Sequence, residues 1–413
     1  MNARPGAARD GTDDSPLAAF RARARRLLGG EGRAELVVSP YRFNPLGAHV
    51  DHQGGRVLAR TLDQYTWLAF RPGVDGRVTL RFDEAGPDGD GRDASDTCTF
   101  AIGEASITEG VADSRVRFAR AATAVLHAHA PLERGLSGVV RGTLVGAGLS
   151  SSASVTLAYL TALAAANDLA LDERTLVELV RRVENDHLGL ANGVQDQMSV
   201  VYGRSGALSL LDVDHVAMTP VVDPPTADDV RWLLCYSGVS RELAAGSGFN
   251  TRVAECREAA ALLHPGAVRL GDVPDARRGE DSLAALPEPF GRRARHVFTE
   301  MNRVAVGVDA WRHGDWRFFG ELMDASCRSS IEQYESGGEW LIALHEIARE
   351  TPGVLGSRFS GGGYGGCLVM LVERDLVDPV AASVLGRYVA RYPEFAALAR
   401  TFVATPERGV RLA

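Results

Sequence analysis

The spacing of hydrophobic and polar positions predicts alternating helices and strands along the first half of the chain. Residues 16–29 (PLAAFRARARRLLG) have the pattern of an amphipathic helix that ends at a glycine pair. Apolar, β-rich runs follow (ELVVSP, RVLART, YTWLAF, RVTLRF and TCTFAI), and a polar loop, EAGPDGDGRDASD, separates the last two. A helix (VRFARAATAVLHAHA), a strand (GLSGVVRGTLV) and a strongly apolar helix (SSASVTLAYLTALAAAN) come next. A further helix, DERTLVELVRRVENDHLG, begins at the N-cap Asp172 and ends at Gly189.

The pattern changes after Gly203. ALSLLDV and VRWLLCYS predict strands, most of residues 249–350 predicts helix, and SRFSGGGYGGCLVMLV predicts a strand pair. A last helix, DPVAASVLGRYVARY, precedes a terminal strand, TFVAT. We therefore expect an α+β fold with a disordered tail at residues 1–15, an N-terminal domain at 16–205 and a C-terminal domain at 206–413.

The composition is that of a globular protein large enough for two domains. The 413 residues are 45% hydrophobic and 24% charged. No run approaches the roughly 18 apolar residues of a membrane helix. The first fifteen residues lack the apolar core of a signal peptide, so we expect a cytoplasmic protein without a membrane partner. The net charge of −8 argues against nucleic acid as the main partner, and the oligomeric state, monomer or dimer, stays open.

Two features of the composition narrow the range of possible binding and catalytic sites. The five cysteines form no C-x-x-C pair, which argues against both a disulfide framework and a zinc site. Every basic residue is arginine, and the chain contains no lysine. A Schiff-base lysine and a lysine-containing phosphate loop are therefore excluded.

A polar stretch, RFNPLGAHVDHQGG, runs from Arg42 to Gly55 and combines an arginine, two histidines, an aspartate and three glycines. Its HVDH portion, with His49, Asp51 and His52, suggests a metal site, but no further ligand motif accompanies it. Two carboxylates farther along the chain, Glu184 and Asp196, suit phosphoryl transfer, in which one acid holds a metal while the other orients the nucleophile. Taken singly, each carboxylate is more often a solvated or capping acid.

Two glycine-bearing segments suggest close approach to a ligand. GAGLSSSAS, residues 146–154, lies between a strand and a long helix, where backbone amides and the helix dipole favour phosphate and serine hydroxyls suit magnesium. A capped helix after a flexible turn is the alternative, and a Rossmann loop would need a third glycine. SRFSGGGYGGC, residues 357–367, has five glycines in six residues, including Gly361, Gly362 and Gly363. Ordering such a run without a ligand costs several kcal/mol of backbone entropy, although a flexible surface loop is the alternative.

In this order, the segments resemble the motifs of the GHMP small-molecule kinases, most closely the galactokinase branch. The family signature G-R-V-N-L-I-G-E-H-T-D-Y-N-G-G corresponds to YRFNPLGAHVDHQGG, G-G-G-L-S-S-S-A-S to GAGLSSSAS, and G-S-R-M-T-G-G-G-F-G-G-C to GSRFSGGGYGGC. GLANGVQDQ and SGFNTRVAECRE match two supporting segments, so the resemblance covers about residues 38–372. It implies a two-lobed GHMP kinase fold, with a first lobe like domain 2 of ribosomal protein S5, and an active site between the lobes.

The resemblance also implies roles for individual residues. Arg42 and Asp196 match the catalytic pair, with Asp196 accepting the proton of the sugar's anomeric hydroxyl and Arg42 keeping it ionised. Ser152 and Glu184 match magnesium ligands. The triphosphate of ATP, the co-substrate, would lie on Gly146, Ala147, Gly148, Leu149, Ser150, Ser151 and Ser152, and Arg117 and Phe118 match an adenine-flanking pair more weakly. Sugar-binding positions are Ala48, His49, Asp51, Asn192, Gly193 and Phe249, the last replacing a tyrosine of the galactokinases.

Ala48 is the most informative departure from the galactokinase motif, which has glutamate at this position to receive the sugar 6-hydroxyl. A glutamate would repel a C6 carboxylate by about 4 kcal/mol at 4 Å and an effective dielectric of about 20. The plant galacturonokinase version, R-x-C-P-L-G-A-H-I-D-H-Q-G-G, is more similar to this sequence and shares Pro45, Ala48, His52 and Gln53. We therefore favour D-galacturonate as substrate, with His52 or Arg60 as the expected partner of its carboxylate.

Three alternatives stay open at this stage. The chain could encode a galactokinase, a kinase for an amino sugar or another sugar acid, or a sugar- and ATP-binding sensor without catalysis. The sensor is the weakest alternative because GLSSSAS, Arg42 and Asp196 are all intact.

Overall fold

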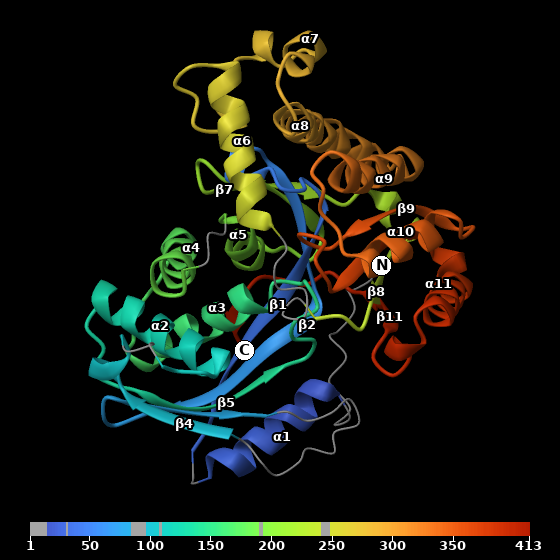
Figure 1. Ribbon diagram of the computed structural model, residues 1–413. Coiled ribbons are helices and arrows are strands. Elements are labelled where there is room, and N and C mark those ends of the chain that lie inside the picture. Colours follow the sequence, from blue (N-terminus) through green and yellow to red (C-terminus); the bar gives the residue numbers. More distant parts are fainter. Residues whose placement is uncertain (1–14, 30–31, 84–95, 107–109, 190–192, 241–247) are drawn as a thin grey trace, which may run out of the picture.

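Two lobes, each built on its own β-sheet, form the protein (Figure 1). The computed structural model describes residues 15–29, 32–83, 96–106, 110–189, 193–240 and 248–413. The predicted tail lies outside these residues except for Ser15, which caps the first helix, and most of the polar loop at 84–96 lies outside them as well. Within the described residues, no helix has the length and apolar character needed to cross a membrane. The mixed, two-lobed architecture confirms the predicted α+β class.

The first sheet has eight strands, in the order β12-β1-β2-β5-β3-β4, with β6 on β2 and β7 on β6. Side chains alternate between its faces as the period of two predicts: Val37 and Leu68 join one core, whereas Val38 and Trp67 join another. Its strands are β1 (Glu35–Leu46), β2 (Val57–Pro72), β3 (Arg77–Phe82), β4 (Asp96–Ala101), β5 (Leu136–Gly142), β6 (Ala207–Asp212), β7 (Ala217–Val222) and β12 (Arg411–Leu412).

Helices cover both faces of the first sheet. α1 (Pro16–Leu28) packs Phe20 and Ala24 against one face, and α3 (Ser151–Ala166) packs against β1 and β2 on the other. α3 is apolar on all sides because the sheet and neighbouring helices enclose it. The other helices of this lobe are α2 (Ser114–His129), α4 (Glu173–Arg182) and α5 (Gln195–Tyr202).

The second sheet is antiparallel, in the order β11-β8-β10-β9. Leu233 and Met370 belong to the core under the last two helices, while Leu234 and Val369 share a core with β1, so this sheet is also buried on both faces. Its strands are β8 (Val230–Tyr236), β9 (Val354–Phe359), β10 (Cys367–Glu373) and β11 (Arg400–Ala404). The helices are α6 (Phe249–Leu263), α7 (Glu280–Ala284), α8 (Phe290–His313), α9 (Trp316–Glu332), α10 (Glu339–Arg349) and α11 (Val377–Arg391).

The two lobes exchange chain segments across the predicted boundary near residue 205. β6, β7 and β12 all come from beyond it, yet all three belong to the first sheet. Tyr41 and Phe43 of β1 in turn pack in a core with Trp232 and Leu234 of β8. The segments 16–205 and 206–413 therefore do not coincide with the two sheets.

Candidate active site

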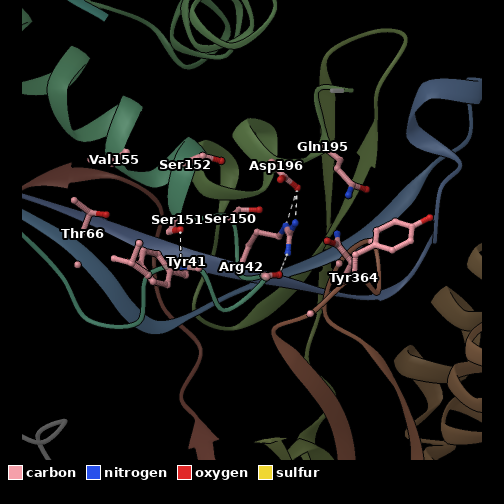
Figure 2. A pocket seen from close by; sticks show the side chains of 18 of the residues that line it. Tyr41, Arg42, Thr66, Ser150, Ser151, Ser152, Val155, Gln195, Asp196 and Tyr364 are labelled. Carbon is pink, nitrogen blue, oxygen red and sulfur yellow. Dashed lines mark hydrogen bonds and ion pairs between the residues drawn. The ribbon is translucent and has the colours of Figure 1, made fainter. Parts of the chain in front are cut away.

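Arg42 of β1 connects three segments that are far apart in the sequence. Its Nε and Nη2 donate hydrogen bonds of 2.9 and 2.6 Å to Oδ1 of Asp196, in the first turn of α5 (Figure 2). Its Nη1 donates to the carbonyl oxygens of Ser360, at 3.0 Å, and Gly148, at 3.3 Å. Arg42 is buried, so this pairing takes place away from bulk water, where charge-assisted hydrogen bonds are strong.

The strand pairing on either side of Arg42 is irregular, and this irregularity affects the direction of the Arg42 side chain. The pairing of β1 with β2 shifts register between Pro40 and Tyr41 and again between Phe43 and Leu46. Bulges of this kind bend a strand and change the direction of a side chain. The Arg42 guanidinium thereby reaches Asp196 instead of following the regular alternation of the sheet.

A cavity of about 750 Å³ extends from this ion pair. One part is walled by the loop at residues 47–51, the start of α5 and the glycine-rich loop at 361–365. Another part is walled by aromatic and aliphatic side chains of the first lobe, among them Phe82, Phe118, Val155 and Tyr159. The segment before α3 contributes Gly146, Gly148, Ser150, Ser151 and Ser152 to the wall.

The start of α3 is suited to bind an anion. Ser150 has a left-handed backbone (φ 60°) and offers no side-chain cap, so the first amides of the helix keep no side-chain partner from the described residues. The Ser150 hydroxyl is buried and likewise has no hydrogen-bond partner there. Free N–H groups, a hydroxyl and the positive end of a helix dipole converge at the cavity wall, which is the arrangement that binds phosphate.

The third glycine motif presses directly against this anion-binding turn. Gly366 has a φ of 94°, and a Cβ there would lie 2.3 Å from the carbonyl oxygen of Ala147. Gly361 approaches the other side, because its Cβ would lie 3.1 Å from the carbonyl oxygen of Gly148. The glycine run is therefore an ordered backbone contact between the lobes rather than a flexible surface loop.

Asp51 lies in the short 3₁₀ turn η1 (Asp51–Gln53) and faces the cavity. Burial raises its pKa, and the nearby Asp196 adds to that effect. Gly193, just before α5, leaves room for this carboxylate, since a Cβ at Gly193 would lie 2.0 Å from Asp51 Oδ2. Asp51 and Gly193 therefore lie against each other in the cavity wall, which is consistent with the prediction that both bind the sugar.

Replacing Gly193 with alanine is expected to raise KM for the sugar at least about tenfold, because the new methyl group must displace Asp51. ATP affinity should stay near normal. Steady-state kinetics with each substrate varied in turn measure both effects. Gly206→Ala is the matched control, because a Cβ there meets nothing within 4 Å. An unchanged sugar KM in Gly193→Ala would show that Asp51 does not bind the sugar.

His49 is fixed by its neighbours rather than free to move. Its ring stacks on Tyr334 at a centroid distance of 4.1 Å, and its Nε2 lies 3.2 Å from the hydroxyl of Ser336. Burial, with a contribution from the nearby His296, holds the pKa of His49 well below its ordinary value. The imidazole is therefore neutral at physiological pH and acts in the cavity as a hydrogen-bonding group.

The apolar part of the cavity corrects one detail of the sequence assignment. Arg115 and Phe118, three residues apart on α2, both line it, whereas Arg117 does not. Residues three apart share a helix face and adjacent ones do not, which explains the difference. The Arg115 guanidinium lies over the ring of Phe82 at 4.5 Å, forming a planar wall of the kind that accommodates a purine.

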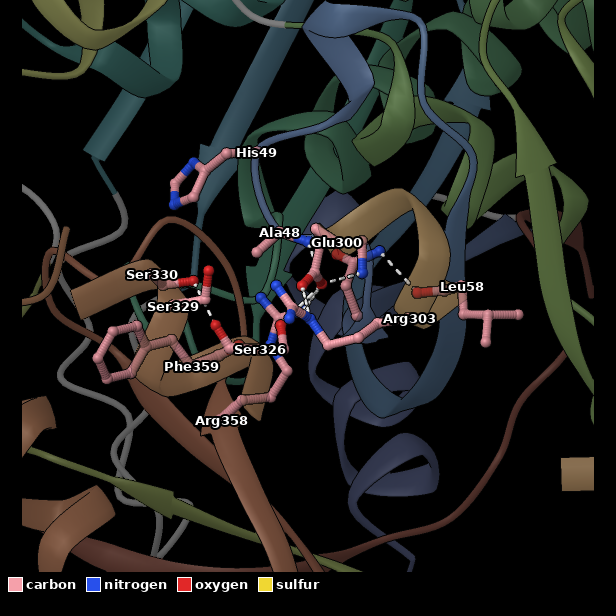
Figure 3. Close-up of polar contacts among 12 residues, drawn as sticks. Ala48, His49, Leu58, Glu300, Arg303, Ser326, Ser329, Ser330, Arg358 and Phe359 are labelled. Carbon is pink, nitrogen blue, oxygen red and sulfur yellow. Dashed lines mark hydrogen bonds and ion pairs between the residues drawn. The ribbon is translucent and has the colours of Figure 1, made fainter. Parts of the chain in front are cut away.

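The main chain of Ala48 is held from both sides by α8 (Figure 3). Its amide donates to Glu300 Oε1 at 2.9 Å, and its carbonyl accepts from His296 Nε2 at 3.0 Å. Burial opposes ionisation of Glu300, but Arg303 and Arg358, among other groups, together lower its pKa to about 2. Ala48 is 5% exposed and lines the cavity, so the methyl group occupies a fixed place in the wall.

Three family models match the chain. They are the GHMP kinases N terminal domain at residues 117–204, the GHMP kinases C terminal at residues 308–390, and the galactokinase galactose-binding signature at residues 25–72. A galacturonokinase from Arabidopsis thaliana is 36% identical over 93% of this chain and 94% of its own length. The chain belongs to the GHMP kinases.

Further relatives place it in the galactokinase branch of this kinase family. A galactokinase from Mycobacterium tuberculosis is 33% identical over 89% of this chain and 96% of its own length. The crystal structure of Lactococcus lactis galactokinase complexed with galactose superposes with a TM-score of 0.84, at 27% identity, covering 96% of this chain and 100% of that one. Methanococcus jannaschii mevalonate kinase, at 14% identity and a TM-score of 0.65, shares the fold.

Several assigned residues of this GHMP kinase lie elsewhere than at the cavity wall. The side chains of Ala147 and Leu149 pack in the hydrophobic core, so these two residues can offer a ligand only their backbone. Glu184 is buried in the π-helical turn η3 (Val183–His187) and does not line the cavity. Asn192 lies outside the described residues, and of Phe249 the structure describes only its place at the start of α6.

Neither residue expected to meet a sugar carboxylate lines the cavity. Arg60 donates to Asp223, with one hydrogen bond of 2.9 Å, and lies over the ring of Trp311. Nε2 of His52 lies 3.2 Å from the hydroxyl oxygen of Tyr334. Sequence proximity to the sugar signature was therefore misleading, because β2 and η1 direct these side chains away from the cavity.

Arg358 and Tyr364 are among the residues of the cavity wall that the sequence did not predict. Both belong to the third glycine motif, SRFSGGGYGGC. A signal was nevertheless present, because an arginine at the edge of a ligand-approaching glycine loop is an evident candidate for an anionic ligand.

Proposed function

We propose that this GHMP kinase transfers the γ-phosphoryl group of ATP to the anomeric hydroxyl of D-galacturonate. The observation that carries the substrate assignment is Ala48, whose methyl group lines the cavity where the galactokinase motif has glutamate. A carboxylate on the substrate meets no repulsion from this position. The similarity to the galacturonokinase supports the same choice.

Asp196 is the proposed base in this reaction. It lies in the cavity wall at the start of α5, held by two hydrogen bonds from Arg42. The guanidinium favours the ionised carboxylate, which can accept the proton of the anomeric hydroxyl as that oxygen attacks phosphorus. The Ser150–Ser152 turn at the start of α3 orients the triphosphate and stabilises its charge.

The donor types that we assign to magnesium, the hydroxyl of Ser152 and the carboxylate of Glu184, suit this ion, although Glu184 is buried in η3 and does not line the cavity. A hydroxyl and a carboxylate are hard oxygen donors, and Ser152 lines the cavity at the phosphate-binding turn. Within the described ranges, no cluster of three or more His, Cys, Asp or Glu residues suits a metal. The phosphate oxygens of ATP would therefore supply the remaining ligands, and the ion would neutralise their charge.

Ser152→Ala and Glu184→Gln are each expected to raise the magnesium concentration needed for half-maximal activity, because each variant removes one oxygen ligand. Magnesium titration of activity at saturating ATP measures this shift, and magnesium-dependent ATP binding gives a second readout. Asp186→Asn is the control, since Asp186 lies in the same π-helical turn but is exposed. Unchanged titrations in both variants would rule out the assignment.

Release of ADP with a panel of hexoses and hexuronates tests the proposed function. We expect the highest kcat/KM with D-galacturonate. A tenfold preference for galactose over galacturonate would replace the substrate proposal with a galactokinase. Binding of sugar and ATP without ADP release from any sugar would support a sensor instead.

A further inference from the structure

Arg358, the second last residue of β9, is a buried cation in the wall of the cavity near Ala48. It is 2% exposed, and its Nε donates to the carbonyl oxygen of Phe359 at 3.1 Å. Its Nη1 is buried without a hydrogen-bond partner among the described residues. A guanidinium N–H that is shielded from water and left without an acceptor is costly, unless a ligand supplies the acceptor.

The nearest carboxylate, Glu300, does not fill this role. Its Oε1 accepts from the amides of Gly47 and Ala48 and from the hydroxyl of Ser326, and its Oε2 accepts from Arg303 Nε at 2.6 Å (Figure 3). Arg358 Nη1 stands 3.9 Å from Oε1, beyond hydrogen-bond distance. Two arginines thus accompany one carboxylate, which leaves one positive charge in excess beside Ala48.

The other arginines around the cavity are already engaged. Arg42 donates to Asp196 and to two carbonyl oxygens, and Arg115 pairs with Asp113 in the apolar part of the cavity. Arg303 does not line the cavity. Among the described residues of the wall, Arg358 is therefore the cation with a guanidinium nitrogen still to be paired.

We propose that Arg358 is the specificity-determining residue that binds the C6 carboxylate of a hexuronate substrate, with Ala48 making room for that carboxylate. This inference rests on the proposed function and adds the group that recognises the acid. The galactokinase motifs have both a glutamate at the position of Ala48 and an arginine at the position of Arg358. Here the arginine is kept and the glutamate is lost, so the substrate itself would supply the missing negative charge.

The chemistry of a guanidinium suits discrimination between a C6 carboxylate and a 6-hydroxyl. A planar guanidinium binds a carboxylate through two parallel hydrogen bonds, whereas a 6-hydroxyl offers a single neutral oxygen. Burial lowers the pKa of Arg358, and the neighbouring Arg42 and Arg303 add to this effect against the opposing influence of Glu300. A substrate carboxylate would offset the cost of this buried charge, which a neutral sugar cannot do.

Arg358→Met tests the proposal, with kcat/KM measured for galacturonate and for galactose in the wild type and in the variant. We expect the galacturonate-to-galactose ratio to fall at least about thirtyfold, since removing one partner of a desolvated charge pair is expensive. Arg60→Met is the matched control: Arg60 is equally buried but paired with Asp223 outside the cavity, so its loss should leave the ratio unchanged.

Arg358→Lys keeps the proposal testable if the methionine variant fails to fold. Lysine keeps the positive charge but cannot donate two parallel hydrogen bonds to a carboxylate. The galacturonate-to-galactose ratio of kcat/KM should therefore fall by several-fold, but less than in Arg358→Met. An equal loss for both sugars in the folded variants would show that Arg358 only supports the structure. A wild-type enzyme that prefers galactose would instead reject the proposed substrate, and the two failures are therefore distinguishable.

Discussion

Asp196→Asn is expected to lower kcat by two or more orders of magnitude, while KM for the sugar and for ATP stays near normal. Asparagine is almost isosteric and can still accept one hydrogen bond from Arg42, so the wall of the cavity should keep its shape. It cannot take a proton from the anomeric hydroxyl, and it removes the charge that the buried guanidinium of Arg42 pairs with. The loss should therefore fall on the chemical step.

Steady-state kinetics and single-turnover phosphoryl transfer measure this effect, and thermal unfolding checks that the variant folds. Asp168→Asn is a suitable control because Asp168 forms an ion pair with Arg134 on the surface, where its side chain is 83% exposed. Retention of most of the activity in Asp196→Asn would show that another group accepts the proton or that positioning alone carries the reaction.

Ala48→Glu is expected to reverse the sugar preference by lowering kcat/KM for galacturonate about a hundredfold or more relative to galactose. A carboxylate about 4 Å from the C6 carboxylate costs about 4 kcal/mol at an effective dielectric of about 20. The main chain of Ala48 is held by Glu300 and His296, so it cannot move aside to relieve the repulsion. Galactose should suffer less, because a glutamate can accept the proton of its 6-hydroxyl.

Ala48→Gln separates charge from volume, since glutamine fills the same space without a charge. Galacturonate should lose less activity with glutamine than with glutamate, and the difference measures the electrostatic part. The inserted glutamate would also compete with the substrate for Arg358, which lines the same cavity. Equal kcat/KM ratios in the wild type, Ala48→Glu and Ala48→Gln would contradict an acidic substrate at this position.

Several features of this protein could be predicted from local sequence because their causes are local. The period of two along β1 and β2 specifies which face of the sheet each side chain joins, and the apolar face of α1 specifies which of its side chains are buried. The N-cap at Asp172 begins α4, as predicted, although a π-helical turn rather than further α-helix follows Arg182. The order of the glycine motifs sufficed to indicate the kinase family, which the comparisons confirm.

The sequence by itself determined the Gly/Ser-rich turn before α3 and the absence of a carboxylate at position 48, because each depends on residue type within a short motif. The family resemblance implied the Arg42–Asp196 pair, and only the folded chain brings these two side chains together. Only the tertiary structure decided that β6, β7 and β12 complete the first sheet, since strand pairing over such separations depends on the whole core. It likewise directed Arg60 away from the cavity and Arg358 into its wall. The direction of a charged side chain follows from the bends of its strand and from the partners it meets, and neither can be read from its distance along the chain.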